Sequence, residues 1–254
     1  MTEMELLIDL HRQQARQGPG SDAQTRLMMS LAGLENTAGL QIADIGCGTG
    51  ASSVLLATEL GAEVTAVDFL PEFLAELTTR AAQAGVANHI QTMACDMTEL
   101  PFADSAFDVL WAEGAIYNIG FEKGVQQWRR FLKPDGVLVA PEITRTTAAR
   151  PDDIEAYWQA NYPESDTASV KIKQLEAAGY RPLAYTVLPT GCWLENYYRP
   201  LEDSFQGFIQ RHGNSSQAKA LVDAEREEIA MYTANQAYYS YGVYIAQRLD
   251  SESH

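Results

Sequence analysis

Short apolar runs separated by amphipathic stretches recur through the first 145 residues of the chain. The runs are rich in β-branched residues and predict buried strands over residues 42–45, 63–67, 90–94, 107–111 and 137–140. Helical spacing predicts helices over 51–60, 71–84 and 123–132, with residues 133–136 as the turn that ends the third. Strands that alternate with helices in this way predict an α/β fold, in which helices cover both faces of a mostly parallel sheet.

The pattern changes on either side of this region. It predicts N-terminal helices over 1–17 and from about 22 to 34, broken by Gly-Pro-Gly, with Ser21 or Asp22 as the cap of the second. After residue 145 it predicts a helix over 169–178, strands over 184–188 and 239–245, and a frayed tail. We therefore expect a Rossmann-like, doubly wound, seven-stranded sheet with the last strand antiparallel. The stretch 190–235, before that strand, is too long for a bare loop and predicts a helical insertion, with a helix over 218–232.

A glycine-rich turn joins the first strand to the first helix, in the sequence Asp44-Ile-Gly-Cys-Gly-Thr-Gly50. Glycines allow a sharp turn and a close approach of a ligand to the backbone, and the following helix offers free N–H groups there. A strand, a glycine turn and a helix start are typical of a cofactor-binding corner.

Acidic residues lie at the ends of four predicted strands: Asp44, Asp68, Asp96 and Glu113. Ligands of open α/β sheets bind outside the carboxyl ends of the strands, so these acids should converge on one cleft. Their chemistry suits a ligand rich in hydroxyl groups, amines and positive charge: a ribose at Asp68, an adenine amine at Asp96, and an ammonium or sulfonium at Asp44 and Glu113. A pyrophosphate would be a poor neighbour for so many carboxylates.

Composition narrows the classes of partner. The formal net charge of −16 argues against a nucleic-acid surface and against binding to an anionic membrane. The three cysteines, Cys47, Cys95 and Cys192, have no spacing typical of a zinc site or a disulfide framework. No signal peptide or membrane span is visible. We expect a cytoplasmic protein with a small-molecule substrate and no metal, and a homodimer is left open.

The motifs together resemble those of the class I S-adenosylmethionine-dependent methyltransferases. The resemblance rests on residues 44–50, on Asp68, on Asp96-Met97, and on the later runs 100–109 and 132–136. The runs 16–20 and 111–120 are similar to a bacterial subgroup of small-molecule methyltransferases. The resemblance implies methyl transfer to an O, N or C nucleophile by in-line displacement, with S-adenosyl-L-homocysteine as the product of the cofactor.

The resemblance also implies roles for individual residues. Gly46 and Gly48 would allow the cofactor to lie close to the backbone. Asp44 would hold the methionine amino group, and Asp68 would bind the ribose. Phe69, Asp96 and Met97 would hold the adenine. Gln17 and Gly18 would close over the methionine end beside Glu113. The chain is then a single methyltransferase domain, 1–254, with an N-terminal helical lid (1–35), a cofactor-binding core (36–145) and the insertion 190–235, which caps the substrate site or forms a dimer contact.

The substrate side is less defined by sequence. Candidate bases at the cleft are Glu113, Tyr117 and Glu142, and His11 and His212 are further candidates outside any motif. Aromatic residues gather in the C-terminal part, where they could line a pocket, form the core of the insertion or make a dimer surface.

Two other functions stay open on this pattern. Gly46, Gly48 and Ala51 also satisfy a Gly-x-Gly-x-x-Ala fingerprint, so an NAD-dependent oxidoreductase on a Rossmann fold is one alternative. A non-catalytic S-adenosylmethionine-binding protein is the other, because a cofactor pocket does not by itself imply chemistry.

Overall fold

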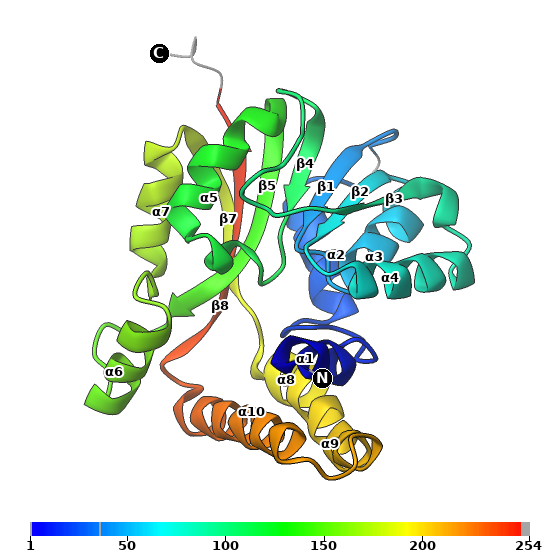
Figure 1. Ribbon diagram of the computed structural model, residues 1–254. Coiled ribbons are helices and arrows are strands. Elements are labelled where there is room, and N and C mark those ends of the chain that lie inside the picture. The colour runs from blue at the N-terminus through cyan, green and yellow to red at the C-terminus, as the bar shows by residue number, and fades with distance from the viewer. Residues whose placement is uncertain (1, 36, 250–254) are drawn as a thin grey trace.

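The computed structural model describes residues 2–35 and 37–249 of the chain. Seven strands form the main sheet in the order β3-β2-β1-β4-β5-β8-β7 (Figure 1). The strands are β1 (Gln41–Ile45), β2 (Glu63–Asp68), β3 (Ile90–Ala94), β4 (Phe107–Trp111), β5 (Leu132–Arg145), β7 (Tyr180–Val187) and β8 (Tyr239–Arg248). Strand β8 runs antiparallel to β5 and to β7, while β1 to β5 pair in parallel. The predicted fold class is confirmed, including the antiparallel last strand.

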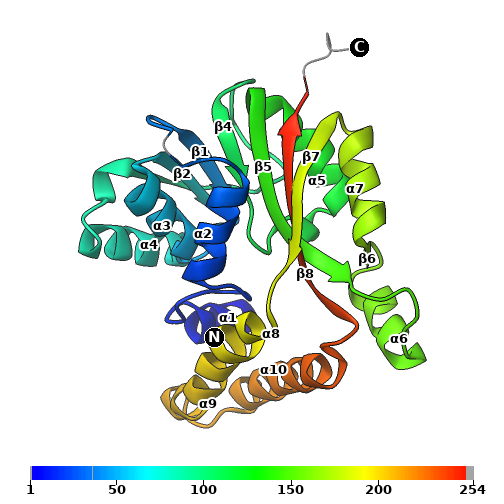
Figure 2. The ribbon, with the colours of Figure 1, turned by 180° about the vertical axis from the view of Figure 1, so that it is seen from behind.

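Helices cover both faces of the sheet and also form a separate group beyond its end (Figures 1 and 2). The helices are α1 (Glu3–His11), α2 (Asp22–Leu31), α3 (Ala51–Leu60), α4 (Pro71–Gln83), α5 (Phe121–Trp128), α6 (Asp152–Asn161), α7 (Ala168–Ala177), α8 (Thr190–Trp193), α9 (Arg199–Arg211) and α10 (Ser216–Asn235). Helices α2, α3 and α4 bury their apolar residues on one face, and α5 and α7 bury theirs on the other. No helix within the described residues is long and apolar enough to cross a membrane.

The carboxyl ends of β1, β2 and β4 therefore meet at one edge of the sheet, where ligands of this fold class bind. Helices α1, α8, α9 and α10 lie together beyond that edge (Figure 1). The insertion is thus folded, and Trp193, Tyr198 and Phe205 from it belong to the main hydrophobic core.

Several predicted boundaries are wrong. The first helix ends at His11 rather than near residue 17, because residues 12–21 leave the helix and fold toward the glycine turn. Strand β5 begins at Leu132, and the predicted turn 133–136 is an irregularity within it where Asp135 has φ of 61°. A two-residue strand, β6 (Asp166–Thr167), pairs with β5 and was not predicted. The predicted tail falls mainly on residues 250–254, which lie outside the described residues.

Candidate functional site

The glycine turn between β1 and α3 is held in a conformation that side chains would prevent. Gly46, Gly48 and Gly50 have φ of 76°, 55° and 84°. A Cβ on Gly46 would lie 2.3 Å from the Cβ of Ala115, and one on Gly48 would lie 2.5 Å from Oε1 of Gln17. The turn is therefore packed closely against Ala115 and Gln17, in a conformation that glycine alone adopts without strain.

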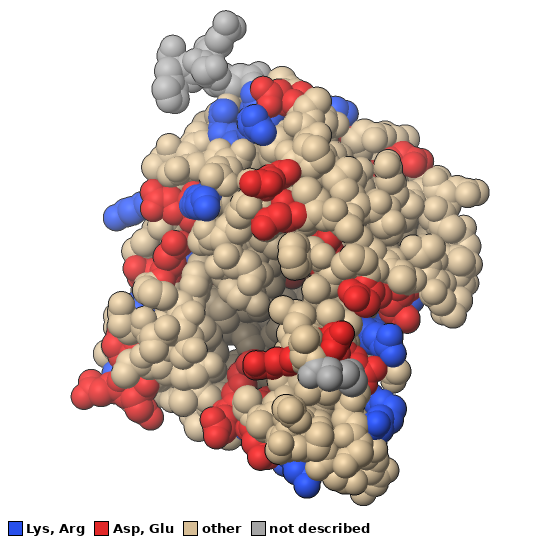
Figure 3. Space-filling view, in the orientation of Figure 1, with Lys and Arg blue, Asp and Glu red and all other residues tan. Residues whose placement is uncertain are grey.

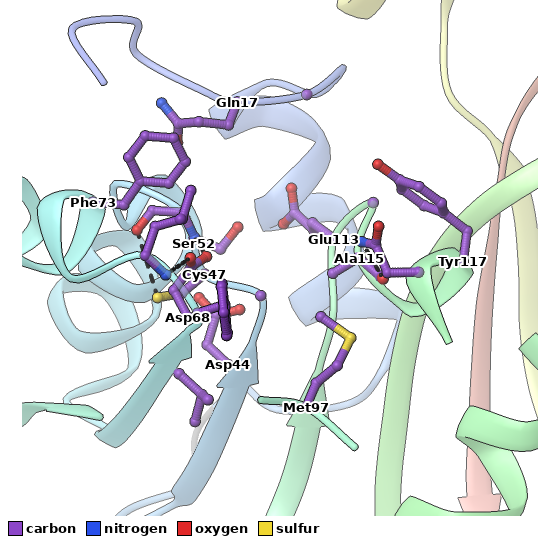
Figure 4. A pocket seen from close by; sticks show the side chains of 18 of the residues that line it. Gln17, Asp44, Cys47, Ser52, Asp68, Phe73, Met97, Glu113, Ala115 and Tyr117 are labelled. Carbon is purple, nitrogen blue, oxygen red and sulfur yellow. Dashed lines mark hydrogen bonds between the residues drawn. The ribbon is translucent and has the colours of Figure 1, made fainter. Parts of the chain in front are cut away.

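A cavity of about 540 Å³ opens over this turn. It is lined by all of the residues predicted to bind the cofactor, which are Gln17, Gly18, Asp44, Gly46, Gly48, Asp68, Phe69, Asp96, Met97 and Glu113. The four acids predicted at the strand ends thus do meet at one site. In Figure 4, Asp44 and Asp68 lie beside the glycine turn, and Glu113 and Tyr117 lie across the cavity from them.

Asp44 is a buried carboxyl group at the floor of the cavity, only 1% exposed. Burial raises its pKa to about 7, and the carboxylates of Glu113 and Asp68 act in the same direction. The hydroxyl of Ser53 donates to Asp44 Oδ2 at 2.6 Å and opposes the shift. Asp44 is therefore poised to gain from a positively charged group placed against it.

This burial makes stability depend on pH. A carboxyl whose pKa is higher in the folded state stabilises the fold at low pH, and that contribution is lost as pH rises toward the folded pKa. We expect cofactor-free protein to lose roughly 2–3 kcal/mol of unfolding free energy between pH 5 and pH 8 through Asp44 alone. Denaturant unfolding at both pH values should show a smaller fall for Asp44→Asn and an unchanged fall for the exposed control Asp104→Asn. Equal falls in all three proteins would contradict the assignment.

Asp68, at the end of β2, holds the glycine turn that follows the neighbouring strand β1. It accepts the N–H of Gly48 on Oδ2 and the N–H of Leu70 on Oδ1, both at 2.9 Å. Burial raises its pKa, although these hydrogen bonds oppose the change. Next to it, the ring of Phe69 is 68% exposed at the cavity, which is a costly place for an aromatic side chain unless a planar ligand covers it.

Asp96 lies at the outer end of the cavity and is exposed. Its Oδ1 accepts the backbone N–H of Thr98 at 2.8 Å and the Thr98 hydroxyl at 2.7 Å, and these bonds lower its pKa. The other oxygen is left for a ligand. Met97 lines the cavity between Asp96 and the glycine turn.

Glu113 is the centre of a network that joins the N-terminal segment to the sheet. Its Oε2 accepts from Nη1 of Arg16 at 2.9 Å, and its Oε1 accepts from the hydroxyl of Thr25 at 3.0 Å and from Nε1 of Trp111 at 2.9 Å. The side chain of Arg16 is 9% exposed and that of Glu113 is 12% exposed. A carboxylate held by a buried guanidinium and two further donors is a poor general base.

Gln17 fastens the same segment to the glycine turn. Its Oε1 accepts from the backbone N–H of Thr49 at 2.8 Å and from the Thr49 hydroxyl at 2.9 Å. Its amide nitrogen donates to the carbonyls of His11 and Gln14. Residues 12–21 therefore form a roof over the cavity. Gln17, which was predicted to contact the ligand, holds this roof against the glycine turn.

The candidate bases differ in position. Tyr117 lines the cavity and is 39% exposed. Glu142 is fully buried and lies outside the residues that line the cavity, so its predicted place at the cleft is wrong. His11 pairs with Glu225 at 3.0 Å and His212 with Asp9 at 2.9 Å, and both histidines tie α1 to the insertion helices instead of facing the cavity.

Some site residues were missed by sequence reasoning. Arg16 was quoted only within a motif, yet it holds Glu113. Met4 and Leu7 of α1 and Phe73 of α4 also line the cavity, and nothing in their local sequence distinguishes them from core residues. Within the described residues, no group of three or more His, Cys, Asp or Glu side chains is placed to hold a metal ion.

Comparison with known proteins agrees with this geometry. Residues 42–136 match the family model described as a methyltransferase domain. The chain is 31% identical over 128 residues to demethylmenaquinone methyltransferase of Desulfitobacterium hafniense, which covers 49% of this chain and 50% of that protein. It is 34% identical over 119 residues to 27-O-demethylrifamycin SV methyltransferase of Amycolatopsis mediterranei, covering 46% and 44% respectively. The chain thus spans about half the length of the curated relatives it matches.

Among solved structures, the fold is similar to a SAM-dependent methyltransferase from Geobacter sulfurreducens crystallised with S-adenosyl-L-homocysteine. The TM-score is 0.84 over 95% of this chain and 97% of that one, at 18% sequence identity. At that identity the likeness concerns the fold.

Proposed function

We propose that this chain is a class I S-adenosylmethionine-dependent methyltransferase and that it methylates an O, N or C nucleophile of a small molecule by in-line displacement. The observation that carries the proposal is the cavity itself. A glycine turn that excludes side chains faces a buried carboxyl at Asp44 and a second carboxyl at Asp68. When bound, S-adenosylmethionine supplies a methyl group on a positively charged sulfur, and that charge is lost on transfer.

The residues present fit this cofactor. Gly46 and Gly48 line the cavity without side chains, so a ligand can come close to their backbone atoms. Asp44, whose pKa is about 7 when nothing covers it, suits an ammonium group. The Asp68 oxygens, already oriented by two N–H groups, suit the hydroxyls of a ribose.

We assign the remaining cofactor contacts in the same way. Phe69 would cover one face of the adenine, Asp96 would accept its amine with the oxygen that Thr98 leaves free, and Met97 would pack beside it. Glu113 would shape the methionine end while it stays paired with Arg16. Gln17 and Gly18 would close that end from above.

The chain is proposed to work as one domain with a composite lid. Residues 1–35 are tied to the insertion 190–235 by His11–Glu225 and His212–Asp9, and Nδ2 of Asn196 donates to the carbonyl of Gly20 at 3.0 Å. The lid and the insertion would therefore open and close together over the core, 36–145. In this arrangement the insertion caps the substrate side.

For the chemical step the chain mainly supplies alignment and exclusion of water. Tyr117 is the candidate that faces the cavity, and burial raises its pKa, so its hydroxyl stays protonated and orients the acceptor by a hydrogen bond. Glu113 is retained as an anchor for Arg16. Glu142 pairs with Lys171 away from the cavity and has no part in the proposed step.

The alternatives fit less well. An NAD-dependent oxidoreductase would place a pyrophosphate at the glycine turn, against Asp44 and within the field of Asp68 and Glu113. The family match is to a methyltransferase domain. A non-catalytic protein would bind S-adenosylmethionine and transfer no methyl group, so a turnover assay with labelled methyl separates it from the enzyme.

Replacement of Asp68 by alanine should weaken S-adenosylmethionine binding about 5- to 150-fold, equivalent to roughly 1–3 kcal/mol, because the ribose partners and two backbone N–H groups lose their acceptor. Isothermal titration calorimetry with S-adenosylmethionine and S-adenosylhomocysteine measures this directly. Asp104→Ala, which removes an exposed carboxylate elsewhere, is the matched control. Unchanged affinity in Asp68→Ala would remove the basis for the cofactor assignment.

We propose further that the protein acts in the cytoplasm, since its three cysteines are free thiols. The proposed partner is the small-molecule acceptor, with neither nucleic acid nor membrane required. Light scattering would settle whether the chain forms a homodimer.

A further inference from the structure

Four tyrosines gather next to the cofactor cavity, here called the tyrosine wall: Tyr117, Tyr197, Tyr198 and Tyr241. Tyr117 is exposed and Tyr197 is half-buried, while Tyr198 and Tyr241 are buried behind them. Tyr117 lines the cavity directly. Tyr241 packs on Gly114, another lining residue, so closely that a Cβ there would lie 2.9 Å from the ring. The rings of Tyr197 and Tyr198 are 5.0 Å apart. The wall therefore begins where the methionine end of the cofactor would lie.

Helix α10 brings a carboxylate to this wall. The hydroxyl of Tyr198 donates to Oε1 of Glu228 at 3.0 Å. After burial, Glu228 is among the main charges that raise the pKa of Tyr117, Tyr197 and Tyr241, so its carboxylate lies near all of them. Glu228 itself is exposed, which leaves it open to an incoming molecule.

A second carboxyl, Glu142 of β5, lies in the protein interior near the wall. Glu142 is fully buried, and neither of its oxygens has a hydrogen-bond partner among the described residues. Nζ of Lys171, at 3.6 Å, is its nearest counter-charge. Glu142 also raises the pKa of Tyr117 and Tyr241. Because Lys171 is also fully buried, Glu142 has its counter-charge inside the protein, and Glu228 is the carboxylate at the wall that faces solvent.

Lys171 neutralises Glu142, but within the described residues no Lys or Arg side chain pairs with Glu228. The strongest charges that act on Tyr117, Tyr197 and Tyr241 are carboxylates and other phenols. His11, which acts on Glu228, is already paired with Glu225. Figure 3 shows a hollow in the lower half of the molecule with acidic side chains along its rim. Aromatic faces and a carboxylate without a counter-cation attract a cation and repel an anion.

We propose that the methyl acceptor carries a positively charged nitrogen, an ammonium or quaternary ammonium group, which the tyrosine wall and Glu228 bind. The proposal rests on the proposed methyltransferase function and adds the chemical class of its substrate. It concerns recognition of the acceptor and leaves open which atom receives the methyl group. Acceptors whose recognised group is a carboxylate or phosphate are disfavoured by the same charges.

The test uses the full chain saturated with S-adenosylhomocysteine and three probes that share one ring: benzyltrimethylammonium, benzyl alcohol and phenylacetate. Calorimetry should show the cation binding at least about tenfold more tightly than the other two, as expected for a desolvated cation–π site. Glu228→Gln should weaken the cation about tenfold and leave benzyl alcohol unchanged. Glu227→Gln, which removes an exposed charge from the adjacent position of α10, should change neither.

A second pair of variants separates the ring from the hydroxyl. Tyr197→Phe should retain cation binding, and Tyr197→Leu should lose it. Equal affinity for the three probes, no binding of the cation, or the same loss in Glu227→Gln and Glu228→Gln would overturn the proposal. Each of these outcomes leaves the methyltransferase assignment standing if S-adenosylhomocysteine still binds, whereas failure of S-adenosylhomocysteine to bind would overturn that assignment first.

Discussion

Glu113→Ala is expected to destabilise the protein by roughly 3–5 kcal/mol, the usual cost of removing one partner from a buried ion pair. The guanidinium of Arg16, 9% exposed, would keep only Thr25 and the exposed carboxylate of Asp22 as partners. Nε1 of Trp111 would lose its acceptor at 2.9 Å. Because Arg16 precedes Gln17, the roof of the cavity should loosen as well, and affinity for S-adenosylhomocysteine should fall.

Two further variants serve as comparisons for Glu113→Ala. Glu113→Gln keeps an acceptor oxygen but removes the charge, so its loss should be intermediate. Glu59→Ala breaks the exposed pair between Glu59 and Arg26, 2.9 Å apart, and should cost no more than about 1 kcal/mol. Urea unfolding measures all three. If Glu113→Ala cost no more than Glu59→Ala, the network would not hold the lid.

The parts of the site that sequence reveals are those built from neighbours in the chain. The strand 41–45, the turn with its glycines and the start of α3 follow from local apolar pattern and backbone freedom. The acids at the ends of β1, β2 and β4 meet because parallel strands of one sheet end at one edge, so topology predicts their convergence. This reasoning needs no knowledge of side-chain packing.

The parts that sequence does not reveal depend on contacts between distant segments. Glu113 had the features of a base at a strand end, yet Arg16, 97 residues earlier, turns it into an anchor. Glu142 was predicted to follow a strand that ends at residue 140, as the other acids follow theirs. In the structure β5 continues to Arg145, so Glu142 lies within the strand and is buried. Glu228 looks like one more surface acid of α10 in the sequence. Only the docking of α10 brings it within hydrogen-bond distance of Tyr198.

Gly46→Ala is expected to destabilise the protein by roughly 2–5 kcal/mol and to abolish measurable binding of S-adenosylmethionine. Alanine at φ of 76° costs about 1–2 kcal/mol. Its Cβ would also lie 2.3 Å from the Cβ of Ala115, and relief of such overpacking costs typically about 1–3 kcal/mol more. The movement that relieves the clash would displace the backbone that the cofactor has to approach.

Two partner variants separate these costs. Gly61→Ala has φ of 60° and nothing within 4 Å of the new Cβ. It should therefore lower the free energy of unfolding only by the cost of the backbone conformation. Ala115→Gly combined with Gly46→Ala should remove the clash and recover roughly 1–3 kcal/mol, while Ala115→Gly alone supplies the baseline of a double-mutant cycle. Calorimetry on the double variant then asks whether binding returns with stability. A Gly46→Ala protein as stable as Gly61→Ala would mean that the turn can move away from Ala115 at little cost. The glycine turn between β1 and α3 would then not be rigid.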